Sequence, residues 1–344
     1  MHRIHWIIVI VFGLFLIACS RASEIAAFTG FSKPPHFPAA AYRLENNLIT
    51  QEGFELGRKL FYEPRLSRNN TVSCGFCHLQ ASAFTHHGHD VSHGIDDRLG
   101  SRNSPPIMNL AWNTTFMWDG GVFDLDLQPV VPITNPVEMD ETVENVLIKL
   151  RNTAPYPEMF RKAFGTTEIT TARMMKALSQ FMVMLVTDQS KYDSVTRGQA
   201  TFTEQEQRGY TLYSQKCSSC HREPLFTDQS FRNNGIGAGP NNDQGRYDAT
   251  LRPEDRYKFK VPSLRNLAYT APYMHDGRLY TLSGVLKHYK EEVQPSATLD
   301  PLLNNNGRLG IPLTEAEQEL LLAFLNTLND RIFVTDKRFS EEAQ

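Results

Sequence analysis

The fold of this chain is decided by the stretch Ser73-Cys74-Gly75-Phe76-Cys77-His78, which has a second copy at Lys216-Cys217-Ser218-Ser219-Cys220-His221. Cys-x-x-Cys-His is the attachment signature of c-type haem. The two thiols can each add to a vinyl group of the macrocycle, and the histidine becomes the proximal iron ligand. The sequence therefore predicts two covalently bound haem c groups. The predicted cofactor-binding residues are Cys74, Cys77, His78, Cys217, Cys220 and His221.

Other uses of a Cys-x-x-Cys pair fit this chain less well. The chain has five cysteines among 344 residues, and the two motifs contain four of them. A four-cysteine zinc site would need a further pair beside each motif. A dithiol redox site would have a thioredoxin-like strand and helix, which follow neither motif. A formal net charge of −3 argues against a nucleic-acid partner.

The N-terminal part of the sequence predicts export. Residues 1–18 contain an apolar run that is too short to span a bilayer but typical of a signal peptide. The run ends Leu16-Ile17-Ala18-Cys19, which resembles the lipobox of bacterial lipoproteins. We expect Cys19 to carry the lipid that anchors a periplasmic protein to the membrane, its only membrane contact. An ordinary signal peptide or an uncleaved anchor is the alternative. Residues 19–48 have no apolar period, which predicts an extended tether.

Apolar residues at helical spacing predict a mainly α fold. Thr203-x-x-Glu206 and Thr314-x-x-Glu317 are capping boxes that begin two helices, and we expect Asp140 to cap another. A stripe of methionines between residues 171 and 186 is expected to fill a helical core. Residues 83–102 have no periodicity and are expected to form a loop beside the first haem. The expected helices cover residues 50–62, 140–151, 171–186 and 314–328, with one more from 203 towards the second motif.

An internal repeat relates the two halves of the chain. The aligned pairs are Gly57-x-x-Leu60-Phe61 with Gly209-x-x-Leu212-Tyr213, Pro105-Pro106-Ile107-Met108-Asn109-Leu110-Ala111-Trp112 with Pro262-Ser263-Leu264-Arg265-Asn266-Leu267-Ala268-Tyr269, and Phe116-Met117-Trp118-Asp119-Gly120 with Tyr273-Met274-His275-Asp276-Gly277. The repeat predicts two tandem c-type cytochrome domains. Residues 49–199 would form the N-terminal haem domain, and residues 200–344 the C-terminal haem domain.

These two domains and several short sequences resemble the bacterial di-haem cytochrome c peroxidase and MauG family. The residues that carry the resemblance are Leu56-Gly57-Arg58-Lys59-Leu60-Phe61, Gly100-Ser101-Arg102-Asn103-Ser104-Pro105, Trp118-Asp119-Gly120, Asn135-Pro136-Val137-Glu138-Met139 and Leu264-Arg265-Asn266. The resemblance covers about residues 50–328. It implies an N-terminal haem that reacts with peroxide, a C-terminal haem that handles electrons, a tryptophan between them and a calcium ion at the domain interface.

By this resemblance, Trp118 is the inter-haem aromatic residue, and Gln128 and Glu138 match the distal pair of the peroxide pocket. Heterolytic cleavage of the O–O bond needs a group that takes the proton from the near oxygen and delivers it to the leaving one, which a carboxylate can do. Taken alone, Glu138 could be a solvated surface acid, but the surrounding Asn-Pro-x-Glu-Met favours catalysis. The residues that match the calcium ligands are Asn103 through its side chain and Thr270 and Pro272 through their carbonyls.

Two positions determine the coordination expected at the irons. Many family members have a distal histidine that blocks the peroxide haem until the partner haem is reduced, and here that position is Ile95. We therefore expect an open, five-coordinate peroxide haem. A displaced ligand is the alternative, and the neighbouring histidines are His86, His87, His89 and His93. At the C-terminal haem, counting from Pro272 places the distal ligand at Tyr289, with His288 and Met274 as rivals.

We interpret the chain as a di-haem peroxidase that reduces hydrogen peroxide to water. Its electrons would come from a small periplasmic donor, a cytochrome c or a cupredoxin. One alternative is a MauG-like oxidase that uses peroxide to oxidise a protein side chain. Another is an electron-transfer cytochrome without catalysis, which Gln128 and Glu138 argue against. The sequence leaves a homodimer open.

Overall fold

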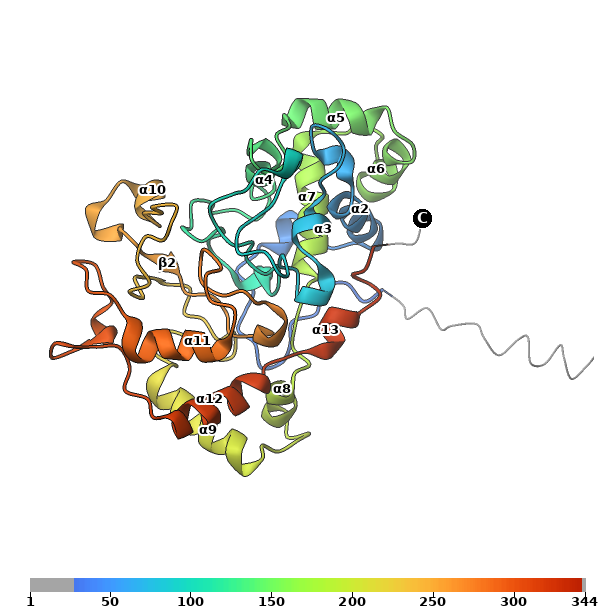
Figure 1. Ribbon diagram of the computed structural model, residues 1–344. Helices are drawn as coiled ribbons and strands as arrows, with labels where there is room; N and C mark the ends of the chain where they lie inside the picture. Colours follow the sequence, from blue (N-terminus) through green and yellow to red (C-terminus); the bar gives the residue numbers. More distant parts are fainter. Residues whose placement is uncertain (1–27, 342–344) are drawn as a thin grey trace, which may run out of the picture. The chain divides into compact units, whose positions relative to one another are not determined.

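The computed structural model describes residues 28–341, and residues 31–341 belong to one compact unit (Figure 1). Its α-helices are α2 (Gln51–Phe61), α3 (Cys74–Cys77), α4 (Val130–Thr134), α5 (Val143–Arg151), α6 (Tyr156–Phe164), α7 (Thr171–Val183), α8 (Lys191–Thr196), α9 (Glu204–Lys216), α10 (Tyr247–Thr250), α11 (Leu282–Lys287), α12 (Glu315–Asn326) and α13 (Arg331–Thr335). Its strands pair antiparallel, β1 (Phe231–Arg232) with β2 (Phe259–Lys260) and β3 (Asn304–Asn305) with β4 (Arg308–Leu309). The predicted mainly α fold is confirmed. The predicted signal peptide and Cys19 lie outside the described residues.

Helices α2 and α7 pack together above the first Cys-x-x-Cys-His motif in the view of Figure 1. Helix α2 begins as predicted, because the Thr50 side chain accepts a hydrogen bond from the backbone N–H of Gly53. The two helices approach closely at Gly57, where an added Cβ would lie 1.9 Å from the carbonyl oxygen of Ala177. Glycine is therefore required at this crossing.

Helices α9 and α12 form a second pair, side by side in Figure 1. Both begin with the predicted capping boxes, in which the side chains of Thr203 and Thr314 accept from backbone N–H groups. Gly209, which the repeat aligns with Gly57, occupies the crossing, where an added Cβ would lie 2.0 Å from the carbonyl oxygen of Leu320. The core beside this pair is aromatic and contains Tyr192, Tyr213, Phe226 and Phe324.

Further positions that the repeat pairs have the same local backbone. Asn109 and Asn266 both have left-handed φ angles, of 55° and 63°. Met117 and Met274 also have positive φ angles, of 67° and 74°. Each methionine lies in a loop closed by an antiparallel bridge, Phe116 to Val122 in one half and Tyr273 to Leu279 in the other. The two loops therefore turn in the same way.

The region between the two aligned halves differs from the prediction in two ways: one helix begins later than expected, and another was not predicted. The helix expected from Asp140 begins at Val143 instead, because Thr142 is the residue whose side chain caps it, accepting from the N–H of Asn145. Asp140 has a left-handed φ of 49° and pairs with Arg68 at 3.0 Å. Helix α6 was not predicted, since two prolines near its start obscure the pattern.

The segment predicted as a tether is packed against the unit from residue 31 onwards. Phe37 is 3% exposed, and its ring lies 4.9 Å from that of Trp112. The indole N–H of Trp112 donates to the carbonyl oxygen of Pro38 at 2.9 Å. Residues 31–48 are therefore part of the folded unit. Periodicity could not reveal this, because isolated aromatic residues hold a segment that has no helix or strand repeat.

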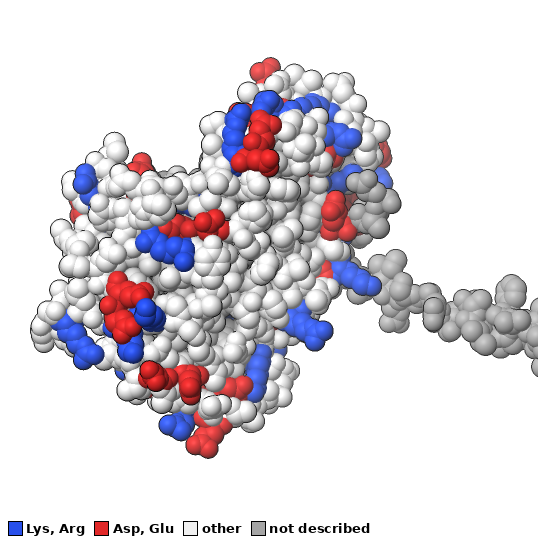
Figure 2. Space-filling model, in the orientation of Figure 1, with Lys and Arg blue, Asp and Glu red and all other residues white. Residues whose placement is uncertain are grey.

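Two observations concern the apolarity of the helices and the charges on the surface. Within residues 28–341, no helix is both long enough and apolar enough to cross a membrane. Figure 2 shows lysine and arginine side chains interspersed with aspartate and glutamate on the face that it draws.

Candidate functional site: two Cys-x-x-Cys-His motifs and their surroundings

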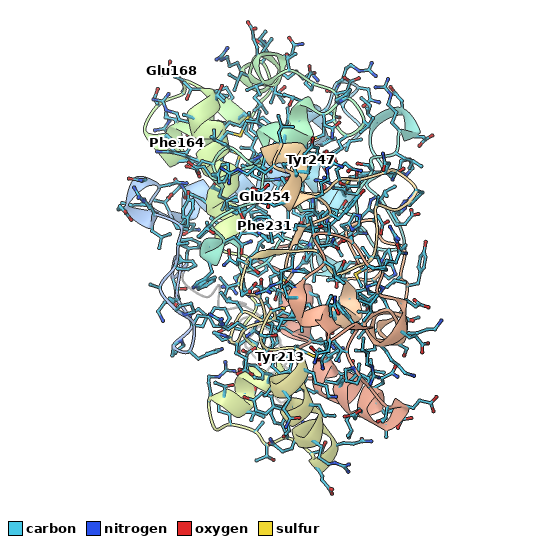
Figure 3. The ribbon with its side chains drawn as sticks, turned by 90° about the vertical axis from the view of Figure 1, so that its left-hand side faces the viewer. Phe164, Glu168, Tyr213, Phe231, Tyr247 and Glu254 are labelled. Carbon is cyan, nitrogen blue, oxygen red and sulfur yellow. The ribbon has the colours of Figure 1, made fainter. Side chains whose placement is uncertain are left out.

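A cavity of about 430 Å³ lies beside the second motif. Cys217, Cys220 and His221 line it, together with mostly apolar side chains and Tyr213 of α9 (Figure 3). The Nδ1 atom of His221 lies 3.1 Å from the carbonyl oxygen of Pro262. A carbonyl only accepts, so Nδ1 is the protonated nitrogen and Nε2 has a free lone pair. Burial lowers the pKa of His221, which keeps the imidazole neutral.

The first motif has the same arrangement. His78 places Nδ1 2.7 Å from the carbonyl oxygen of Phe84, and burial lowers the pKa of His78 to about 4. Cys74 and Cys77 begin and end the single turn of α3. A histidine with Nδ1 bonded to a carbonyl is oriented to ligate a metal through Nε2. Both motifs, and the apolar cavity at the second, therefore fit covalent haem.

Glu138 lies close to the first motif. Its Oε1 accepts a hydrogen bond from Ser92 Oγ at 3.2 Å, and its carbonyl oxygen accepts from the N–H of Ile95 at 2.8 Å. Burial raises the pKa of Glu138, and the hydrogen bond from Ser92 only partly opposes this. Burial and the charge of Glu138 together raise the pKa of Cys77 to about 12. A poorly solvated carboxyl group therefore faces the first motif, as expected for a proton-transfer residue.

The other two predicted catalytic residues lie on one loop and its continuation. The indole N–H of Trp118 donates to the carbonyl oxygen of Asn103 at 2.8 Å, and Trp118 lines the cavity of the second motif. Gln128 Nε2 donates to the sulfur of Met117 at 3.7 Å. No hydrogen bond joins Gln128 to Glu138 within residues 28–341. The structure thus places Glu138 close to the first motif and Trp118 at the cavity of the second. Gln128 contacts Met117, the residue that precedes Trp118.

The three residues predicted to bind calcium all line the cavity that Trp118 lines. Asn103 Nδ2 donates to the carbonyl oxygens of His89 and Asp90, at 3.2 and 3.1 Å. Its Oδ1 is therefore available as an acceptor. With the carbonyls of Thr270 and Pro272 it would form a hard oxygen donor set of the kind that calcium prefers. Calcium binding stays a prediction.

The rival ligands at the second motif are in different positions. Tyr289 and Met274 line the cavity, whereas His288 is absent from its lining and places Nε2 3.1 Å from the carbonyl oxygen of Asn234. The Met274 sulfur accepts a hydrogen bond from Asn234 Nδ2 at 3.4 Å, much as Met117 accepts from Gln128. Tyr289 belongs to a π-helical segment, His288–Glu292, of the kind often found at functional sites. Burial raises the pKa of Tyr289 to about 12, partly opposed by Asn234. Tyr289 and Met274 therefore share the cavity lining, and the ligand at the second motif stays a prediction.

Ile95 is fully buried, and its backbone is bonded to Glu138. His86 is also buried, and its ring stacks on that of His89 with centroids 4.0 Å apart. His93 Nε2 lies 3.1 Å from Asp97 Oδ1, and His87 is exposed. Within the described residues, no group of three or more His, Cys, Asp or Glu side chains is arranged to hold a metal ion.

The sequence did not reveal a buried ion pair beneath the second motif. Arg265 donates to Asp193 at 2.8 and 2.9 Å, and both side chains are 0% exposed. Arg265 also donates to the carbonyl oxygen of Pro224, and His36 Nε2 lies 2.9 Å from Asp193. Arg265 stood within a run that carries the family resemblance, but its partner is 72 residues away in sequence. Only the fold brings these residues together.

Comparisons with known proteins agree with this geometry. The family described as di-haem cytochrome c peroxidase matches residues 51–201. The chain is 34% identical to methylamine utilization protein MauG of Methylorubrum extorquens, over 94% of each chain. It is also 34% identical to cytochrome c551 peroxidase of Nitrosomonas europaea, over 80% of this chain and 79% of the relative. The crystal structure of a MauG-like protein associated with microbial copper homeostasis is 35% identical, with a TM-score of 0.82 over 90% of this chain and 98% of that chain.

Proposed function

Because the chain belongs to the family of di-haem cytochrome c peroxidases that includes MauG, we propose that it reduces hydrogen peroxide to water at the first motif with electrons that enter through the second. Haem c bound at each motif would supply the redox-active iron. The observation that carries this assignment is the asymmetry between the motifs. A half-buried carboxyl group, Glu138, lies close enough to the first to raise the pKa of Cys77, whereas a tyrosine, Tyr289, lines the cavity of the second.

At the first motif, Glu138 would move the peroxide proton. As a carboxylate it takes the proton from the oxygen nearer the iron, and as a carboxylic acid it gives that proton to the leaving oxygen. Burial raises the pKa of Glu138, so its two protonation states lie closer in free energy near neutral pH than those of a solvated glutamate. Ser92 orients the carboxyl group through the hydrogen bond to Oε1. Gln128 would orient the substrate.

Trp118 would connect the two motifs. Its indole ring lines the cavity of the second motif, and its N–H is fixed by the carbonyl oxygen of Asn103. Asn103 is itself held in place, since its backbone N–H donates a hydrogen bond to the carbonyl oxygen of His275. A calcium ion held by Asn103, Thr270 and Pro272 would stiffen this junction. Together these contacts would limit the motion of the Trp118 indole ring.

The same proposal includes the organisation of the whole chain. The matching glycine crossings and loop conformations support two tandem haem domains, residues 49–199 and 200–344. We also propose export to the periplasm and a lipid on Cys19, which rest on the sequence alone. The electron donor would be a small redox protein of the same compartment.

The buried Ile95 leads to a prediction for the resting protein. Since isoleucine has no ligating atom, the iron at His78 should remain five-coordinate, and electron paramagnetic resonance of the oxidised protein should show a high-spin ferric signal. An entirely low-spin spectrum would mean that a loop histidine ligates the iron. Separate changes of His86, His87, His89 and His93 to alanine would then identify the ligand.

The cavity of the second motif leads to a prediction about Tyr289. A tyrosinate ligand lowers the haem potential, so ascorbate should fail to reduce this haem in the parent protein. Tyr289→Phe should convert it to a five-coordinate haem, seen as a new high-spin signal. Met274→Leu, the matched control on the same cavity wall, should leave coordination unchanged. Loss of the low-spin signal in Met274→Leu, with Tyr289→Phe unaffected, would assign the ligand to methionine.

A MauG-like oxidase of a protein side chain is the second candidate. Ile95 and Tyr289 favour it, as does the 34% identity to a protein named MauG. A steady-state assay separates the two. Rapid consumption of hydrogen peroxide with a reduced cytochrome c or cupredoxin supports the peroxidase. Negligible turnover with either donor, in a protein that still reacts with peroxide, would overturn the peroxidase in favour of the oxidase.

A further inference from the structure

Lys260 is a cationic side chain on the wall of the cavity beside the second motif, and it has no carboxylate partner within residues 28–341. The cationic side chains of Lys and Arg that line this cavity are Lys216, Arg232 and Lys260. Lys216 pairs with Glu317 at 3.3 Å, and Arg232 pairs with Asp300 at 2.8 Å. Lys260 forms no such pair. A partly buried ammonium group that is not neutralised is costly, so this position suggests that a ligand supplies the negative charge.

The surroundings of Lys260 leave room for such a charge. Its Nζ donates to the carbonyl oxygen of Thr115 at 2.6 Å, which uses one of its three N–H donors. The hydroxyl of Thr115 is buried and has no hydrogen-bond partner among the described residues. Burial lowers the pKa of Lys260 to about 8. Two polar groups from different halves of the repeat therefore lie together with unused hydrogen-bonding capacity.

A second observation comes from His275, on the same cavity wall. Its ring stacks on that of Phe259, the neighbour of Lys260 on β2, with centroids 3.7 Å apart. Its Nε2 is buried, lies 4.0 Å from Asp276 Oδ2 and has no hydrogen-bond partner among the described residues. An unused ring nitrogen and an unpaired ammonium group thus line the same cavity.

We propose that Lys260, with His275 on the lining of the same cavity, forms a carboxylate-binding subsite for a propionate group of the haem at the second motif. The inference rests on the proposed function, because it requires haem c there. Cys217 and Cys220 would hold the vinyl edge of the macrocycle, and the propionates project from the opposite edge. The backbone N–H of Lys260 donates to the carbonyl oxygen of Trp118 at 2.8 Å. Lys260 is therefore a positioning residue that fixes this edge of the haem beside the tryptophan.

The test is a redox titration of the haem-loaded protein, followed by its visible spectrum. Lys260→Met removes a positive charge near the iron and leaves the propionate uncompensated, which favours ferric haem. The midpoint potential of the C-terminal haem should shift to more negative values, while that of the N-terminal haem stays unchanged. Lys260→Arg should keep the parent potential. Lys258→Met is the matched control, since Lys258 lies two residues earlier and faces Asp255 at 3.5 Å.

Three results would overturn the subsite. The C-terminal potential could be unchanged in Lys260→Met, it could shift equally in Lys258→Met, or both haems could shift together. If Lys260→Met does not yield haem-loaded protein, Lys260→Gln is titrated in its place and judged by the same results. The titration needs no peroxide turnover. Loss of peroxidase function would therefore leave this result intact, and an unshifted potential would leave the peroxidase proposal intact.

Discussion

Replacing Glu138 with glutamine should slow the reaction of the protein with hydrogen peroxide by about a hundredfold or more, the scale on which general acid–base catalysis is lost. Glutamine has nearly the same shape and can still accept from Ser92, but it cannot take up the peroxide proton. The rate constant is measured by mixing the haem-loaded protein with peroxide. Haem content, measured as the pyridine haemochrome, should match that of the parent.

The pH dependence provides an internal check on this role. Burial raises the pKa of Glu138, so the carboxylate that accepts the proton is lost as pH falls through that raised value. The parent rate should decline there, whereas the Glu138→Gln rate should not change. Glu144→Gln is the control, since Glu144 is an exposed acid in the first turn of α5. A parent-like rate in Glu138→Gln would remove the carboxylate from the mechanism.

Replacing Arg265 with leucine should lower the free energy of unfolding by about 3–5 kcal/mol, the cost of leaving one partner of a buried ion pair unpaired. Both side chains are 0% exposed, and Arg265 also supports the loop at Pro224 near the second motif. The measurement is denaturant unfolding of the haem-loaded protein. Arg161→Leu removes an exposed pair with Glu158 and should leave the stability close to that of the parent.

The pKa of Asp193 determines how the stability loss in Arg265→Leu should change with pH. Burial alone would raise the pKa of Asp193, but Arg265 lowers it to about 2. The pair therefore contributes its full stability above the pKa of an unfolded aspartate, about 3.9, and loses it as pH falls towards 2. The destabilisation by Arg265→Leu should be largest at neutral pH and smaller in acid. A difference that stays constant over this range would mean that Arg265 stabilises by packing alone.

Local signals in the sequence were enough for the motifs and for the helices that begin at a predicted threonine cap. Thr50, Thr203 and Thr314 cap helices as predicted, because a cap depends on residues three positions apart. The start of α5 was wrong because Asp140 and Thr142 are both good caps, and ion pairs to distant arginines hold the aspartate elsewhere.

The candidate site was predictable only where a motif or the resemblance named a residue. Glu138 and Trp118 could be named in this way, although their contacts with Ser92 and Asn103 could not. The pairing of Asp193 with Arg265 and the isolation of Lys260 depend on long-range packing. No spacing rule connects residues that lie far apart in the chain, so such groups become visible only in the folded structure.

The most direct test of the whole account is to mix the fully oxidised protein with hydrogen peroxide in a stopped-flow spectrometer, without an electron donor or prior reduction. If Ile95 leaves the first iron open and Glu138 serves that motif, as we propose, the haem spectrum should change rapidly on mixing. One-electron reduction beforehand should not be required. A resting protein whose spectrum is unchanged by peroxide, and which reacts only after reduction, would contradict the account of an open peroxide site at His78.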